Sequence, residues 1–185
     1  MTGADGTGIR LPHLSGASSA VRLVIAAQAV DGIDHICEIG GAGLPITHFI
    51  RHRPKSVTVV DPKIEPYESL QLNGKACIVR HLACKFQQSE LQPREGSLAV
   101  VMLGVSLKPW GRQPTVTEPL VMLCRSAALV VLEYAENLDR PIQQVPELVQ
   151  KAELKQLWGV DLVLHDDAIT GSGHERRRLS VFRPS

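Results

Sequence analysis

The sequence has few aromatic residues, almost no net charge and no long apolar run. Aromatic residues make up 4% of the 185 residues, which leaves few flat side chains on which nucleobases could stack. The 20 Lys and Arg residues nearly balance the 19 Asp and Glu residues, for a net charge of +1, so no charge excess favours a nucleic acid or an anionic membrane. No stretch approaches the roughly 18–20 consecutive apolar residues of a membrane-spanning helix. The composition therefore gives no support for a nucleic-acid partner, and we expect no membrane partner.

Cysteine is also scarce, and the four cysteines lie far apart, without a Cys-x-x-Cys pair. Such a pair is typical of redox and zinc sites. Residues 1–12 contain one arginine and no apolar stretch of the kind found in secretory signals. Disulfides are rare in proteins that stay in the cytosol. We therefore expect a cytoplasmic protein whose cysteines are small buried hydrophobic residues, at Cys37, Cys77, Cys84 and Cys124.

What the sequence does contain is the composition of one folded globular domain, with 44% hydrophobic and 21% charged residues. Residues 1–15 are rich in glycine and polar side chains, and we expect a loose arm there, followed by a single domain over 16–185. A helix is predicted from residue 18 to Asp31-Gly32, because apolar residues recur at helical spacing. Its predicted buried face comprises Val21, Val24, Ile25, Gln28 and Ala29.

The rest of the chain alternates between short apolar runs and helical patterns. Strands are predicted over 35–39, 56–60, 76–80, 97–103, 128–133, 160–165 and 178–182. Further helices are predicted over 45–52, 65–72, 117–125 and 145–157. This alternation is typical of a doubly wound α/β fold. We expect three layers around a mostly parallel sheet of seven strands, with an antiparallel C-terminal strand that closes a hairpin.

In such a sheet, ligands bind beyond the carboxyl ends of the strands. The first predicted strand ends in Glu38-Ile39 and is followed by Gly40-Gly41-Ala42-Gly43. Glycines allow a tight turn and a close approach of the backbone to a ligand. Asp61 follows the second strand, 21 residues after Gly40, where an acidic side chain can accept hydrogen bonds from both hydroxyls of a ribose. The combination predicts a ligand that contains a ribose.

This arrangement resembles the Rossmann-like class I S-adenosylmethionine-dependent methyltransferases over residues 18–184, including the helix before the first strand and the terminal hairpin. The resemblance implies S-adenosyl-L-methionine as cofactor and methyl transfer as activity. It places the methionine part of the cofactor on the glycine turn, the ribose on the acid after the second strand, the adenine after the third strand and the methyl group beyond the fourth. The residues that match these positions are Glu38, Gly40, Gly41, Gly43, Asp61, His81, Leu82, Leu103 and Gly104.

Three departures from the family pattern keep other functions open. The glycine turn is one residue shorter than in the family, the adenine-binding acid after the third strand is missing, and the fourth strand ends in Leu103-Gly104 without an acid. A non-catalytic binding module with the same fold is one alternative, and transfer of a different group from the same cofactor is another. A nicotinamide-dependent oxidoreductase would need Gly-x-Gly-x-x-Gly, but Ile46 stands where the third glycine belongs.

The acceptor is expected to be a small molecule, recognised by the last hairpin loop and the end of the fifth strand. His165 and His174 flank that loop, and Glu133-Tyr134 end the fifth strand. A histidine, with a pKa of about 6.5, can accept a proton at neutral pH, and the candidate catalytic residues are His165, His174 and Tyr134. We expect no bound metal, because ligands on a mobile Gly-Ser-Gly loop hold a metal poorly. The chain carries no inserted cap, which leaves an open pocket, a lid from a second subunit of a homodimer, or a protein acceptor as alternatives.

Overall fold

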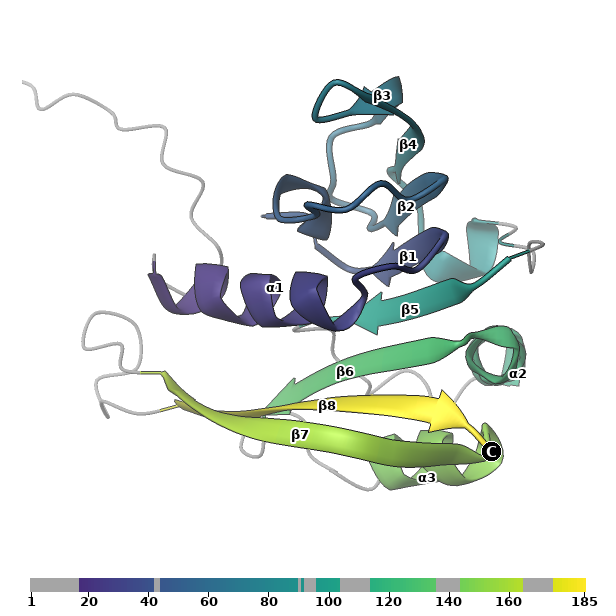
Figure 1. The fold of residues 1–185 in the computed structure, drawn as a ribbon. Coiled ribbons are helices and arrows are strands. Elements are labelled where there is room, and N and C mark those ends of the chain that lie inside the picture. Colours follow the sequence, from purple (N-terminus) through teal and green to yellow (C-terminus); the bar gives the residue numbers. More distant parts are fainter. Residues whose placement is uncertain are drawn as a thin grey trace, which may run out of the picture.

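The computed structural model describes residues 17–41, 44–89, 91, 96–103, 114–135, 144–164 and 175–185. Across these ranges it contains one eight-stranded sheet with the strand order β3-β4-β2-β1-β5-β6-β8-β7 (Figure 1). The predicted arm over 1–15 and residues 165–174 of the predicted hairpin lie outside the described residues.

Five parallel strands form the centre of the sheet. They are β1 (His35–Ile39), β2 (Ser56–Val60), β4 (Lys75–Leu82), β5 (Leu98–Met102) and β6 (Leu129–Ala135). Every residue of β1, β2 and β5 is buried, as expected for parallel strands covered on both faces. The carboxyl ends of the five strands therefore lie along one edge of the sheet, where the sequence places its candidate ligand site.

The chain ends in a long hairpin of β7 (Leu154–Leu164) and β8 (Glu175–Pro184). β8 lies between β6 and β7 and runs antiparallel to both, so β7 points the same way as the central strands. This confirms the predicted antiparallel C-terminal strand. The predicted helix over 145–157 is too long, because the helix ends at Lys151 and Glu153 adopts a φ of 55° before β7 begins.

The predicted helix over 65–72 is wrong, because β3 (Tyr67–Leu72) occupies this stretch and is an eighth strand. β3 pairs antiparallel with β4 at the edge of the sheet. Asn73 and Gly74 join the two strands with φ values of 52° and 74°, the left-handed conformation that a two-residue hairpin turn requires. The chain passes from β2 to β3 at the edge of the sheet and returns through β4, which lies between them. β4 therefore runs parallel to β2 without a crossover helix.

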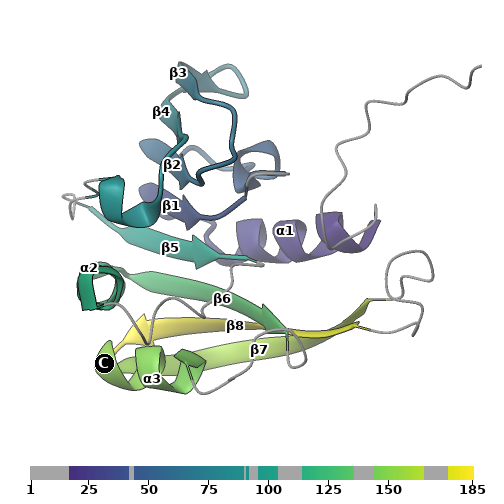
Figure 2. The ribbon, with the colours of Figure 1, turned by 180° about the vertical axis from the view of Figure 1, so that it is seen from behind.

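Two groups of helices cover the two faces of the sheet and complete the three layers. One face packs against α1 (Ala17–Ala29) and the short 3₁₀ turn η1 (Ile46–His48). The other packs against α2 (Pro114–Ser126), α3 (Gln144–Lys151) and the 3₁₀ turn η2 (Phe86–Gln88). Figure 1 shows α1 in front of the sheet. Figure 2, seen from the opposite side, shows α3 in front of β7. The predicted helix over 45–52 is reduced to the single turn η1.

The buried face of α1 differs from the predicted one. Val21 and Val24 are 50% and 54% exposed. The residues that face the sheet are Arg22, Leu23, Ala26, Ala27 and Val30. Ile25 and Ala29 of the predicted face are half-buried against this core, whereas Gln28 is exposed. The sheet instead accepts two alanines, which permit close packing, and an arginine for which it supplies a buried carboxylate.

The described residues contain neither a disulfide nor a helix long and apolar enough to cross a membrane. Cys37, Cys77 and Cys124 are buried and Cys84 is half-buried. Burial raises the pKa of the Cys77 and Cys124 thiols, so both stay protonated at neutral pH. Their packing role agrees with the sequence-based expectation.

Candidate cofactor site

The glycine turn after β1 lies directly against the side chain of Glu38. Gly40 and Gly41 have φ values of 98° and 96°, a region that side-chain-bearing residues rarely adopt. The Gly40 N–H donates to the Val60 carbonyl at 2.9 Å, which extends the β1–β2 pairing into the turn. A Cβ atom on Gly41 would lie 2.8 Å from Cδ of Glu38. The turn therefore requires glycine at 41, both for its backbone angle and for its contact with the carboxyl group.

Glu38 itself is fully buried. Its Oε2 accepts a hydrogen bond from the Ile46 N–H at 2.8 Å, at the start of η1. Its Oε1 has no hydrogen-bond partner among the described residues. Burial raises the pKa of Glu38 to about 8, with a further increase from the nearby Asp61 carboxylate, while the Ile46 N–H and the Arg22 guanidinium act in the opposite direction. A buried carboxyl oxygen without a hydrogen-bond partner is unusual in a folded protein and is a feature that a bound group would satisfy.

Asp61 occupies the carboxyl end of the neighbouring strand. Its N–H donates to the Leu82 carbonyl at 3.1 Å, and its Oδ1 accepts from the Lys63 N–H at 2.8 Å. These bonds hold the residue between the ends of β2 and β4. The side chain remains partly exposed, so its carboxylate can still accept hydrogen bonds from a ligand. Glu38 and Asp61 thus come together at one edge, as the sequence predicts.

His81 and Leu82 end β4 and point to opposite faces of the sheet. Nε2 of His81 lies 3.2 Å from Oγ1 of Thr47 on η1, and its ring centroid lies 5.3 Å from that of Tyr67 on β3. Burial, with a smaller contribution from His48, lowers the pKa of His81, so its ring is neutral at pH 7. Tyr67 was missed because β3 was predicted as a helix, although Asn73-Gly74 signals a hairpin.

The carboxyl end of β6 contains a buried ion cluster of Arg22, Glu133 and Arg177. Nη1 of Arg22 donates to Oε2 of Glu133 at 2.6 Å, and Nη1 of Arg177 lies 3.5 Å from Oε1 of Glu133. Glu133 is 2% exposed, and its carboxylate links α1 to the neighbouring strands β6 and β8. Arg22 was missed because the apolar spacing of the helix places it outside the predicted buried face.

Tyr134 lies on the opposite side of the sheet from Glu133, half-buried against the core formed with α2 and α3. Leu103, just after β5, is buried on the α1 side. The other candidate residues, Gly43, Gly104, His165 and His174, lie outside the described residues and stay predictions. The described part of the chain has no group of three or more His, Cys, Asp or Glu side chains that could hold a metal ion.

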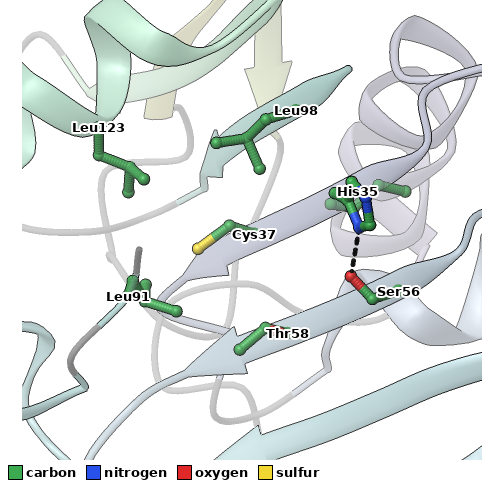
Figure 3. Close-up of a pocket in the computed structure, with 8 residues that line it drawn as sticks. His35, Cys37, Ser56, Thr58, Leu91, Leu98 and Leu123 are labelled. Atoms are coloured by element: carbon green, nitrogen blue, oxygen red, sulfur yellow. Dashed lines mark hydrogen bonds between the residues drawn. The ribbon is translucent and has the colours of Figure 1, made fainter. Parts of the chain in front are cut away.

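A small cavity lies on the face of the sheet under α2, at the amino end of the strands (Figure 3). His35 and Ser56, the first residues of β1 and β2, line it, and Nδ1 of His35 lies 2.8 Å from Oγ of Ser56. Its volume of about 20 Å³ gives room for one water molecule. The cavity is therefore too small for a nucleotide and lies at the wrong end of the strands for the glycine turn.

The structure is similar to several solved methyltransferases. Over 92% of this chain and 99% of the other, it superposes on the N-methyltransferase NodS from Bradyrhizobium japonicum with a TM-score of 0.59 and 17% identity. A Burkholderia thailandensis 1,6-didemethyltoxoflavin N1-methyltransferase gives a TM-score of 0.56 and 14% identity over 98% of this chain and 80% of that one. The chain has the class I methyltransferase fold.

A third methyltransferase-fold protein, an S-adenosylmethionine-dependent methyltransferase from Methanosarcina mazei, matches with a TM-score of 0.54 and 13% identity over 86% of this chain and 96% of that one. No protein-family model and no curated protein matches the sequence. Two features separate the class I methyltransferase fold here from a plain dinucleotide-binding fold, namely α1 before β1 and the β7–β8 hairpin. Both were predicted from the sequence.

Proposed function

We propose that the protein binds S-adenosylmethionine at the carboxyl ends of β1 and β2 and transfers its methyl group to a small molecule. The observation that carries this proposal is the pairing of two carboxyl groups at that edge. Glu38 lies buried under the glycine turn with Oε1 unsatisfied among the described residues, and Asp61 stands partly exposed at the end of the next strand.

The described residues fit this cofactor. Its methionine part carries an ammonium group, which complements Glu38 across the glycine turn, and its ribose hydroxyls complement the Asp61 carboxylate. Gly41 has no Cβ atom, and a side chain there would collide with Glu38. The backbone of the turn can therefore lie close to the Glu38 carboxyl group and leave space above the turn for a ligand. The cofactor supplies a methyl group bonded to a positively charged sulfur. The chain must align the acceptor with that group and accept a proton where the acceptor carries one.

A small acceptor is supported by composition and by one structural neighbour. The balanced charge and low aromatic content offer little for a nucleic acid, and the Burkholderia enzyme was solved with its acceptor, 1,6-didemethyltoxoflavin, bound. We assign the acceptor side to Tyr134, His165 and His174, with a histidine as the base where one is needed. A second subunit could cover this side in a homodimer.

A binding module without transferase activity is the second candidate. The enclosure of Glu133 by Arg22 and Arg177 favours it, because this carboxylate, at the end of the strand where an acceptor would lie, is already engaged. The two candidates agree on cofactor binding and differ in turnover. Conversion of S-adenosylmethionine to S-adenosylhomocysteine in the presence of a panel of small amines, phenols and thiols separates them.

Asp61→Ala is expected to weaken S-adenosylhomocysteine binding by about 10–150-fold, because charge-assisted hydrogen bonds to the ribose are worth about 1.5–3 kcal/mol. Titration calorimetry measures the change. Asp31→Ala is the matched control, since Asp31 also follows a regular element and its carboxylate contacts only His52 among the described ion pairs, at 3.3 Å. Equal affinities for the Asp61 variant, the control and the wild type would remove Asp61 from the site.

A further inference from the structure

Among the described residues, the buried carboxyl group of Glu38 has no cation that pairs with it alone. The cation that faces it is Arg22 on α1, and Nη1 of Arg22 already donates to Glu133 at 2.6 Å. The hydrogen bond that Glu38 accepts comes from a neutral donor, the Ile46 N–H. A buried carboxylate without a dedicated counter-charge is strongly unfavourable, and such a group takes up a proton instead.

The charges around Glu38 support a neutral acid in the free protein. Asp61, after β2, places a second negative charge nearby, while Arg177 on β8 reaches Glu133 rather than Glu38. The pKa of Glu38, raised to about 8 chiefly by burial, means that most molecules carry this proton at pH 7.

We propose that the cofactor's ammonium group binds across the glycine turn by displacing the proton of Glu38. The O–H bond of the Glu38 carboxyl group breaks, the proton passes to solvent, and an ammonium–carboxylate pair remains. No bond of the ligand changes. This inference rests on the proposed function. It also explains how the site would select its ligand, because without an ammonium group the ligand does not stabilise the ionised form of the Glu38 carboxyl group.

The pH dependence has a definite sign. Below pH 8 the free protein holds a proton on Glu38 that the complex lacks, so raising the pH favours the complex. The affinity for a ligand with an ammonium group should therefore rise about tenfold between pH 6 and pH 7 and level off above the pKa of Glu38. The ligand's own ammonium stays protonated between pH 6 and pH 7.

The test is a pair of calorimetric titrations at pH 7, each in phosphate and in Tris, whose ionisation enthalpies differ. S-adenosylhomocysteine carries the ammonium group. 5′-Methylthioadenosine keeps the adenine and ribose but lacks the ammonium and carboxylate groups of the amino-acid part. The missing carboxylate cannot explain proton release from Glu38, because a nearby negative charge favours the protonated carboxyl group. We expect release of about 0.9 proton per S-adenosylhomocysteine bound and none for 5′-methylthioadenosine. Equal proton release for the two ligands would overturn the proposal.

Glu38→Gln keeps the size of the side chain and an oxygen for the Ile46 N–H, and it should abolish proton release on binding S-adenosylhomocysteine. Persistent release in a folded Glu38→Gln protein would show that another group loses the proton. If this variant does not fold, the wild-type affinities for the two ligands at pH 6 and pH 7 decide, since their ratio should change about tenfold and a constant ratio refutes the proposal. Failure of both ligands to bind would instead refute the proposed function.

Discussion

Glu133→Ala is expected to lower the free energy of unfolding by about 3–5 kcal/mol. The Glu133 carboxylate is almost fully buried and receives Arg22 from α1 at 2.6 Å and Arg177 from β8 at 3.5 Å. Its removal leaves two buried guanidinium groups without their carboxylate. The loss should appear as a shift of the urea unfolding midpoint, monitored by far-UV circular dichroism, with little change in the slope of the transition.

Glu147→Ala is the control for this variant. Glu147 lies 2.6 Å from Lys151 one helical turn later, but both side chains are about half exposed. Such a surface pair contributes only about 0.3–0.5 kcal/mol. Similar losses for Glu133→Ala and Glu147→Ala would mean that water reaches Glu133, and that the ion cluster does not hold α1 on the sheet.

Gly41→Val is expected to weaken S-adenosylhomocysteine binding by at least about 100-fold, which corresponds to about 2.7 kcal/mol. The valine would have to adopt a φ near 96°, which is strained for a β-branched residue. Its Cβ would also lie within 2.9 Å of both carboxyl oxygens of Glu38, so the turn and Glu38 cannot both keep their positions. Calorimetry measures the affinity, and circular dichroism measures the folded fraction.

Gly32→Val is the control that separates backbone strain from the collision with Glu38. Gly32 has a φ of 80°, but a Cβ there would meet no atom within 4 Å, so this variant carries the backbone strain without the collision. Each variant should lose about 1–3 kcal/mol of stability from strain, and only Gly41→Val should lose affinity. A folded Gly41→Val protein that binds as tightly as Gly32→Val would show that the ligand does not use the turn.

The central strands could be predicted because the sequence features that indicate them lie within the strands or directly beside them. β1 and β2 span the predicted ranges 35–39 and 56–60. The run 56–60 is rich in β-branched residues, which favour strands, and the glycine turn directly after residue 39 marks the end of β1. The convergence of Glu38 and Asp61 followed from the same reasoning, because the carboxyl ends of neighbouring parallel strands meet at one edge.

The errors have two causes. Tyr67–Leu72 forms a strand because it pairs with β4 across the two-residue turn Asn73-Gly74, a local hairpin signal that the helical interpretation of 65–72 overlooked. Arg22 faces the sheet because Glu133, 111 residues later, supplies its partner. Sequence spacing also gave no means to foresee that Glu38 would be fully buried with one oxygen unsatisfied, which is the feature that distinguishes this site from any tight glycine turn.

The central claim is that the edge formed by Glu38, the glycine turn and Asp61 binds S-adenosylmethionine. Its most direct test is calorimetric titration of the wild-type protein with S-adenosylhomocysteine and, separately, with NAD⁺. We expect saturable heat with one S-adenosylhomocysteine per chain and none with NAD⁺. Saturable binding of NAD⁺, or no heat and no thermal stabilisation with S-adenosylhomocysteine, would contradict it.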